Sequence, residues 1–211
     1  EPEKDESISA SEATLGNVLH AIMHRLYTPY IGQQITNSTI EGLLRLVNDD
    51  AYWASLAPLQ DLKGDRLAEK VVRTYVNNIL HYDYTCTPFQ LLAAEQPIRV
   101  VLPNNMTING TLDRLDIKAG MTRVVDYKTG KKSFDLSEVR YGIGIQMLLY
   151  LFALKEKGAD FFGREIEPAG VLYLPARDAV VRGNRTMSEA DWRKALDKEL
   201  VRSGLVLDNP D

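Results

Sequence analysis

The sequence predicts an α/β fold in which a mainly helical N-terminal portion is followed by a short sheet flanked by helices. Apolar residues recur at helical spacing over most of residues 13–85. Alternating patterns separated by turn signals follow in residues 95–127. The chain has 211 residues and is 45% hydrophobic, enough for the core of one domain. We therefore expect an acidic, disordered lead-in at residues 1–12 and a single domain at 13–211, with a sheet-bearing core from residue 86.

Three amphipathic helices are predicted in the N-terminal portion. The first starts near Thr14 and ends before Pro29, because proline lacks the backbone N–H that a helix interior needs. Two more are expected at Thr39–Val47 and Leu67–Leu80, with a loop or a short helix between them.

A β-meander is predicted next. Glu95–Leu102 and Met106–Ile117 alternate in the manner of strands, and Pro103-Asn104-Asn105 between them is a turn signal. Ala119-Gly120 predicts a tight turn that leads into a third strand, Met121–Tyr127.

A helix, a strand and a second helix complete the predicted order. They are expected at Phe134–Lys157, Gly170–Leu174 and Ser188–Val201, with Ser188 as the N-cap of the last helix.

Charge and cysteine content restrict the possible functions. The formal net charge is -4, whereas nucleic-acid binders are often basic, so phosphate contacts would need a local basic patch or a bound cation. Cys86 is the only cysteine, which excludes an intramolecular disulfide and an iron–sulfur cluster held by four cysteines of this chain. The low cysteine content fits a cytoplasmic location.

No stretch of the sequence approaches the roughly 20 apolar residues needed to cross a membrane. The richest apolar run, Gln146–Leu154, is too short. The N-terminus has no hydrophobic signal-peptide core and does not begin with Met, so we expect an excised domain or a processed piece of a longer chain.

Two aspartates are predicted to face each other across the second and third strands. If Ala119-Gly120 forms a two-residue hairpin loop, Lys118 pairs with Met121. The same register places Asp113 opposite Asp126, with Cβ atoms about 4.5–5.5 Å apart. A loop of three or four residues would shift this pairing.

The side chains around this aspartate pair suit metal-dependent hydrolysis. Lys128 shares the face of Asp126, while Asp116 points away from Asp113. Opposed carboxylates repel unless a cation lies between them, and Mg²⁺ or Mn²⁺ prefers oxygen ligands. The lysine could orient or deprotonate a water, or neutralise charge on a phosphate during phosphodiester hydrolysis. The alternative is an ordinary solvated strand face, where Asp and Lys are common.

Four short motifs stand in order along the chain. They are Gly16-Asn-Val-Leu-His20, Gly110-Thr-Leu-Asp113-Arg114-Leu-Asp116, Asp126-Tyr127-Lys128-Thr129-Gly130 and Gln146-Met-Leu-Leu-Tyr150. Together they resemble the RecB- and AddB-like branch of the PD-(D/E)XK nucleases, whose pattern runs G-x-x-x-H, G-x-x-D-R-x-D, D-Y-K-T-G and Q-x-x-x-Y. The resemblance implies a restriction-endonuclease-like core, a short mixed sheet flanked by helices, with an N-terminal helical elaboration.

The resemblance also implies a catalytic centre. Asp113 and Asp126 would bind Mg²⁺ or Mn²⁺ together with the backbone carbonyl of Tyr127. His20 would supply a further ligand or touch a metal-bound water. Lys128 would be the catalytic lysine, acting with the two aspartates. Glu95, outside the four motifs, resembles an acidic position of AddB-like members.

Substrate contacts are implied at four further residues. Gln146 and Tyr150, one helical turn apart, would lie near the metal and the DNA backbone. Arg114 and Lys131 would contact DNA phosphates. Structural alternatives stay open: ordinary helix packing for Gln146 and Tyr150, an acidic partner for Arg114 and a solvated turn for Lys131. His20 could equally be a core histidine.

The sequence departs from the family pattern at two points. Family members often have a glutamate four residues after the motif histidine, where this chain has His24. A zinc site at His20 and His24 is therefore an alternative, although no further zinc ligands lie nearby in the sequence. The cysteines that hold an iron–sulfur cluster in AddB-like relatives are absent, so we expect no cluster within this chain. The tail from Ser203 resembles the closing segment of AddB-like nuclease domains.

The function that the sequence favours is metal-dependent hydrolysis of DNA in repair and recombination. The resemblance implies an exonuclease acting on single-stranded ends, beside a helicase partner or the helicase region of a longer parent chain. Two other interpretations stay open: a non-catalytic, DNA-binding scaffold with a nuclease fold, and a zinc-dependent hydrolase.

Overall fold

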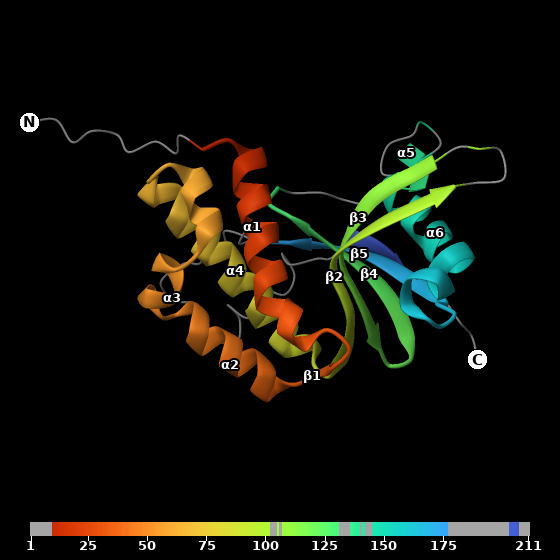
Figure 1. Ribbon diagram of the computed structural model, residues 1–211, viewed down its shortest axis with the longest axis horizontal. Helices are drawn as coiled ribbons and strands as arrows, with labels where there is room; N and C mark the ends of the chain where they lie inside the picture. The colour runs from red at the N-terminus through yellow and green to blue at the C-terminus, as the bar shows by residue number, and fades with distance from the viewer. Residues whose placement is uncertain are drawn as a thin grey trace, which may run out of the picture.

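The structure is a computed structural model that describes residues 10–101, 105, 107–130, 136–139, 141, 145–176 and 203–206. A mixed sheet lies between a group of N-terminal helices on one face and a single long helix, α6 (Ile145–Phe162), on the other (Figure 1). This arrangement is the α/β fold that the sequence predicts. Among the described residues, no helix is both long enough and apolar enough to span a membrane.

The N-terminal portion consists of helices whose first turns are capped by side chains. The elements are α1 (Glu12–Tyr27), η1 (Thr28–Tyr30), α2 (Asn37–Val47), α3 (Asp50–Ala54), η2 (Ala57–Leu62) and α4 (Arg66–Cys86). The side chains of Ser11, Thr36, Asp49 and Asp65 accept hydrogen bonds from backbone N–H groups at the starts of α1, α2, α3 and α4, as helix N-caps do. The three predicted helices are confirmed, and the segment between the last two contains the short helices α3 and η2.

The sheet has six strands in sequence order. They are β1 (Gln34–Ile35), β2 (Phe89–Val101), β3 (Thr107–Lys118), β4 (Met121–Lys128), β5 (Pro168–Pro175) and β6 (Ser203–Val206). All neighbours are antiparallel except β4 and β5, which are parallel and are joined by the crossover that contains α6. The predicted meander, β2–β3–β4, and the expected mixed sheet are confirmed.

Several element boundaries differ from the predictions. Strand β2 begins at Phe89, six residues before Glu95, because a bulge between Leu91 and Ala93 interrupts the alternation that marks a strand in the sequence. The helix predicted at Phe134–Lys157 is two helices, α5 (Leu136–Val139) and α6, and the sequence between them holds two glycines, which have low helix propensity.

Other predictions are tested only in part. The short strands β1 and β6 were not predicted from the sequence. The predicted lead-in reaches into structured chain, because Ser11 caps α1 and Glu12 begins it, whereas residues 1–9 lie outside the described residues. The helix predicted at Ser188–Val201 also lies outside them.

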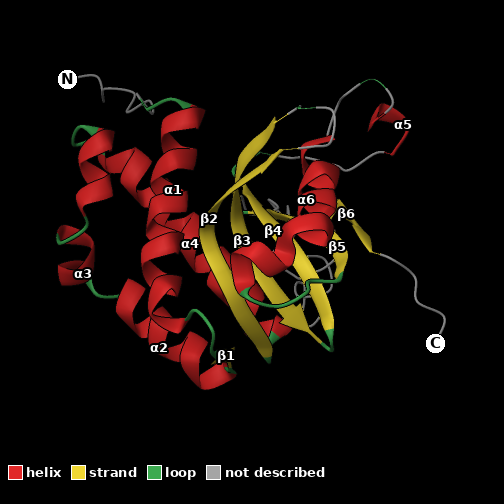
Figure 2. Cartoon of the chain, turned by 45° about the vertical axis from the view of Figure 1, so that its right-hand side comes forward, coloured by secondary structure: helices red, strands yellow, loops and turns green. Residues whose placement is uncertain are grey.

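Two hydrophobic cores flank the sheet (Figure 2). The first is formed by α1–α4 against one sheet face, and the second by α6 against the other. Neighbouring residues of a strand alternate between the two: Val125 and Tyr127 of β4 belong to the first core, and Val124 belongs to the second. Helices therefore cover both faces of the sheet. Polar side chains of the strands are accessible only where no helix packs over them.

Candidate active site

The hairpin between β3 and β4 has the predicted two-residue turn. Ala119 and Gly120 have φ of 50° and 79°, as the primed hairpin turns require, and Lys118 pairs with Met121. Pairing continues in register to Arg114 and Val125. The next residues in this register are Asp113 and Asp126, one step beyond the last paired residues.

Asp113 is fixed against β4 by the backbone. Its Oδ2 accepts a hydrogen bond of 2.7 Å from the backbone N–H of Tyr127. A carboxylate held by a main-chain donor keeps its position without help from a flexible side chain.

Glu95 lies on β2, the strand that neighbours β3 on the side opposite β4. Ala94 pairs with Arg114 and Gln96 with Leu112, so the register between β2 and β3 places Glu95 opposite Asp113. Glu95 has φ of 49°, a left-handed conformation that is rare for a residue with a side chain. Glu95, Asp113 and Asp126 thus form a row of three acidic residues across β2, β3 and β4, which we call the acidic row.

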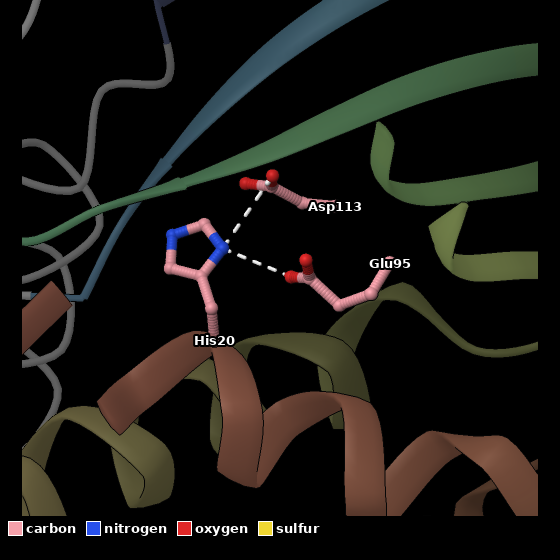
Figure 3. A group of neighbouring side chains, drawn as sticks. All are labelled: His20, Glu95 and Asp113. Atoms are coloured by element: carbon pink, nitrogen blue, oxygen red, sulfur yellow. Dashed lines mark hydrogen bonds and ion pairs between the residues drawn. The ribbon is translucent and has the colours of Figure 1, made fainter. Parts of the chain in front are cut away.

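His20 reaches Glu95 and Asp113 of the acidic row from α1 (Figure 3). Its Nδ1 lies 2.9 Å from Oε1 of Glu95 and 3.4 Å from Oδ1 of Asp113. Potential ligand atoms of His20, Glu95 and Asp113 all lie within 4.8 Å of one another, close enough for one metal ion. The ring of His20 also packs edge-on against the Tyr127 ring, with 5.9 Å between centroids, so an apolar contact orients the imidazole.

Lys128 completes the group on β4. Its Nζ lies 2.5 Å from Oδ2 of Asp126 and 5.7 Å from the centre of the Tyr173 ring on β5. The predicted pairing of Asp126 with Lys128 on one strand face is therefore present, and the ammonium belongs to a side chain that is 27% exposed.

Burial and neighbouring charges shift the pKa values of His20 and Asp126. Burial by itself would lower the pKa of His20, but hydrogen bonds and the charges of Asp113 and Glu95 outweigh it and raise the pKa to about 10. Burial, then the charge of Asp113, raises the pKa of Asp126 to about 6, although Lys128 and His20 act in the opposite direction. Both shifts combine the burial of the group with the close approach of its acidic side chains.

A cavity of about 730 Å³ opens over His20, Glu95, Asp113 and Lys128, whereas Asp126 is not among its lining residues. One wall is a face of α1, and the other is formed by β2, β3 and the end of β4. The lining residues are Glu12, Ala13, Gly16, Asn17, His20, Ala21, His24, Glu95, Thr111, Asp113, Tyr127, Lys128 and Thr129. A substrate in this cavity would contact both the histidine and the lysine.

His24 lines the cavity but stands apart from the group. Its Nδ1 lies 3.4 Å from the hydroxyl of Thr28. Among the described residues, the side chains gathered at metal-binding spacing include His20 and not His24. The arrangement gives no support to a zinc site built on the two histidines.

Gln146 and Tyr150 interact with each other on α6. The amide Nε2 of Gln146 donates to the Tyr150 hydroxyl at 2.6 Å. Gln146 is exposed, whereas Tyr150 is buried in the second core. The Tyr150 ring packs so closely over Gly110 of β3 that a Cβ at position 110 would collide with its hydroxyl and ring carbons. The second and fourth motifs are therefore in direct contact.

The prediction that Arg114 binds DNA phosphate is wrong. Its side chain is 1% exposed and lies in the first core, so its guanidinium is not available to a ligand. It forms ion pairs of 2.7 Å with Asp83 on α4 and 3.1 Å with Asp116, the alternative that the sequence left open. A buried guanidinium needs such partners, because an unpaired charge in an apolar core is strongly destabilising.

The buried charges around Arg114 form a network that joins four elements. Asp83 accepts a hydrogen bond from the Tyr27 hydroxyl at 2.5 Å, and Asp116 pairs with Arg123 at 2.7 Å. Asp116 thus points away from Asp113, as predicted. Sequence reasoning did not find Asp83, although an acid one turn after the buried Ile79 and Leu80 of α4 was a detectable signal. Lys131, the remaining predicted contact, lies outside the described residues.

The site lies within a segment, residues 2–207, that matches the family described as the PD-(D/E)XK nuclease superfamily. The chain belongs to this superfamily. It is similar to an ATP-dependent helicase/deoxyribonuclease subunit of Clostridium botulinum strain Hall, with 37% identity over 98% of this chain and 20% of the relative. The protein of the same name from strain Okra is 38% identical over the same shares. The one from Acetivibrio thermocellus is 40% identical over 53% of this chain and 10% of the relative.

The chain spans a fifth or less of the length of these relatives. The aligned relatives therefore contain long regions that have no counterpart in this chain.

Proposed function

We propose that this chain is the nuclease domain of a RecB- or AddB-like helicase–nuclease and that it hydrolyses DNA phosphodiester bonds with Mg²⁺ or Mn²⁺. The observation that carries the proposal is the meeting of His20, Glu95, Asp113 and Lys128 in one open cavity, with Asp126 beside Lys128. Superfamily membership and the deoxyribonuclease names of the relatives support it. A scaffold has no need for facing carboxylates beside a lysine.

The residues of the site fit a divalent cation. One imidazole nitrogen of His20 and one carboxylate oxygen each of Glu95 and Asp113 lie within 4.8 Å of one another, a donor set that suits Mg²⁺ or Mn²⁺. Burial, then the charge of Asp113, raises the pKa of Asp126, and a bound cation would favour its ionised form. We infer that His20, Asp113, Asp126 and the backbone carbonyl of Tyr127 hold the cation, with Glu95 as a further ligand. When bound, the cation would polarise a phosphoryl oxygen and lower the pKa of a bound water.

The protein side chains would do the remaining work. The Lys128 ammonium would orient or deprotonate the attacking water, or neutralise charge that develops on the phosphate. The exposed amide of Gln146 would contact the DNA backbone, and the buried Tyr150 would hold that amide in position. Asp113 is fixed by the Tyr127 N–H and would enter the reaction without rearrangement.

The substrate and partner follow from the relatives. Their name joins a helicase to a deoxyribonuclease, and this chain matches only a fifth or less of their length. We infer that the domain acts beside a helicase region or partner and that single-stranded ends and exonucleolytic cleavage are its substrate and mode. A bacterial DNA substrate would place it in the cytoplasm.

The proposal is tested by cleavage of a labelled single-stranded oligonucleotide with Mn²⁺. Lys128→Ala should lower the cleavage rate at least a hundredfold, because general acid–base or charge stabilisation of this kind contributes about 10²–10⁴ in rate. The control is Lys155→Ala on α6, where the lysine side chain is 65% exposed and does not line the cavity. A wild-type protein that binds the oligonucleotide but never cleaves it would instead support the scaffold interpretation. Full activity of Lys128→Ala would refute the role of the lysine.

A further inference from the structure

Gly16 stands in the interior of α1, one helical turn before His20. Glycine destabilises a helix interior relative to alanine, because its backbone loses more freedom on folding. Two structural reasons commonly explain such a glycine: a left-handed backbone, or a neighbour too close for a Cβ. A helical glycine that meets neither reason calls for another explanation.

Neither reason applies at Gly16. Its φ lies outside the left-handed range, unlike that of Gly32 or Gly120. A Cβ built on it would meet no atom of the described residues within 4 Å. Gly110 shows the contrast, because there a Cβ would collide with Tyr150. Packing of the described chain therefore leaves the choice of glycine at position 16 unexplained.

The space beside Gly16 is the cavity of the proposed active site. Gly16 lines that cavity, as do the neighbouring small residues Ala13 and Ala21 on the same helix. The spacing from Gly16 to His20 corresponds to about 6 Å along the helix axis. A side chain at position 16 would therefore project into the space directly before the metal-binding group.

The α1 wall of the cavity offers no lysine or arginine among the described residues that could pair with a DNA phosphate. Among the lining residues that the structure describes, Lys128 is the only lysine or arginine, and it lies on β4. The α1 wall contributes Glu12, Asn17 and the histidines beside its small residues. An anionic strand here would be held through bound cations, so its distance from the wall would matter more than ion pairs with α1.

We propose that Gly16 is a clearance position for the substrate: the sugar–phosphate backbone of a single DNA strand lies against α1 at Gly16 on its way to His20. This inference rests on the proposed nuclease function. A cavity of about 730 Å³ is in the size range of sites for small ligands, which suits a stretch of one strand. The missing side chain lets the backbone approach the acidic row closely.

The inference separates stability from substrate binding. Gly16→Ala and Gly16→Leu should each raise Tm by about 2–4 °C, because both residues favour a helix and the Cβ of either would meet no described atom within 4 Å. The same variants should bind the strand more weakly, with Gly16→Leu raising KM for a single-stranded oligonucleotide at least tenfold. A purely structural glycine would not show a gain in stability together with a loss of binding.

A matched control lies in α2. Gly42 is also helical, also meets no atom of the described residues within 4 Å, and does not line the cavity. Gly42→Ala and Gly42→Leu should raise Tm to a similar extent and leave KM unchanged.

Three measurements test the inference. They are KM and kcat for oligonucleotide cleavage with Mn²⁺, oligonucleotide binding by fluorescence anisotropy with Ca²⁺, and hydrolysis of bis(4-nitrophenyl) phosphate. Gly16→Leu should raise KM for the oligonucleotide and weaken its binding in the anisotropy assay. The same variant should hydrolyse bis(4-nitrophenyl) phosphate as fast as the wild type, because a small phosphodiester does not extend along α1. Oligonucleotide binding and KM equal to wild type in Gly16→Leu would overturn the clearance role. A wild type that cleaves neither substrate would overturn the proposed function itself.

Discussion

Metal binding at this site should release a proton from His20. In the metal-free protein, Asp113 and Glu95 raise the pKa of His20 to about 10 against the effect of burial. A histidine binds a metal ion only in its neutral form, so the bound cation must displace that proton. At pH 7 the imidazole lies about three pH units below its pKa, and deprotonation therefore costs about 4 kcal/mol.

The free energy needed to deprotonate His20 sets the pH dependence of metal affinity. The apparent affinity for Mn²⁺ should rise about tenfold per pH unit between pH 7 and 9 and level off near pH 10. Below pH 7 the dependence should steepen, because Asp126, with its pKa raised to about 6, then carries a second proton that the cation must displace.

Isothermal titration in buffers of different ionisation enthalpy measures the released protons directly. We expect close to one proton per Mn²⁺ at pH 8 for the wild type. His20→Ala should abolish this release, while His24→Ala, in the same cavity but outside the metal-binding group, should leave it unchanged. Tight binding of Mn²⁺ by the wild type with no proton released at pH 8 would refute the assignment of His20 as a ligand.

Three further predictions concern stability, each measured by urea unfolding of the metal-free protein with EDTA. Asp126→Asn should raise the free energy of unfolding by up to about 3 kcal/mol at pH 8. The reason is that a carboxyl whose pKa is raised to about 6 stabilises the fold fully below pH ~4 and loses that contribution as pH rises through 6. The gain should vanish at pH 4, and a gain that persists there would contradict the titration argument. Asp83→Ala should lower the free energy of unfolding by about 3–5 kcal/mol, because it leaves the buried Arg114 without its closest partner. Replacing both residues by leucine should recover much of the loss, and a loss below about 1 kcal/mol in Asp83→Ala would contradict the buried ion pair. Gly110→Ala should lower the free energy of unfolding by about 1–3 kcal/mol, because the added Cβ would collide with Tyr150. The loss should be smaller in a Tyr150→Leu background, and an equal loss in both backgrounds would exclude that contact as the cause.

The parts of the site that sequence reasoning predicted depend on local rules. A two-residue turn at Ala119-Gly120 fixes the β3–β4 register, and the alternation of strand side chains then sets the neighbours of Asp126. Both rules operate within one hairpin, so no knowledge of distant packing was needed.

The parts that were missed depend on contacts between distant segments. The place of Glu95 opposite Asp113 follows from the β2–β3 register, and the bulge near Leu91 conceals the start of that strand in the sequence. The sequence around Arg114 fits a surface cation as well as a buried one, and its fate is set by Asp83, which belongs to a helix 31 positions earlier in the chain. A hydrophobic pattern cannot reveal such a long-range pairing.

The Arg114 network has a consequence for exchanging this nuclease between proteins. Tyr27 and Asp83 from the helices meet Arg114 from the sheet, and His20 comes from the same helix as Tyr27. A chimaera joined in front of β2 would import the strands without their charge partners and without the histidine. The smallest transplantable unit of this kind therefore begins upstream of α1, and a junction placed there should preserve both folding and metal affinity in a new host chain.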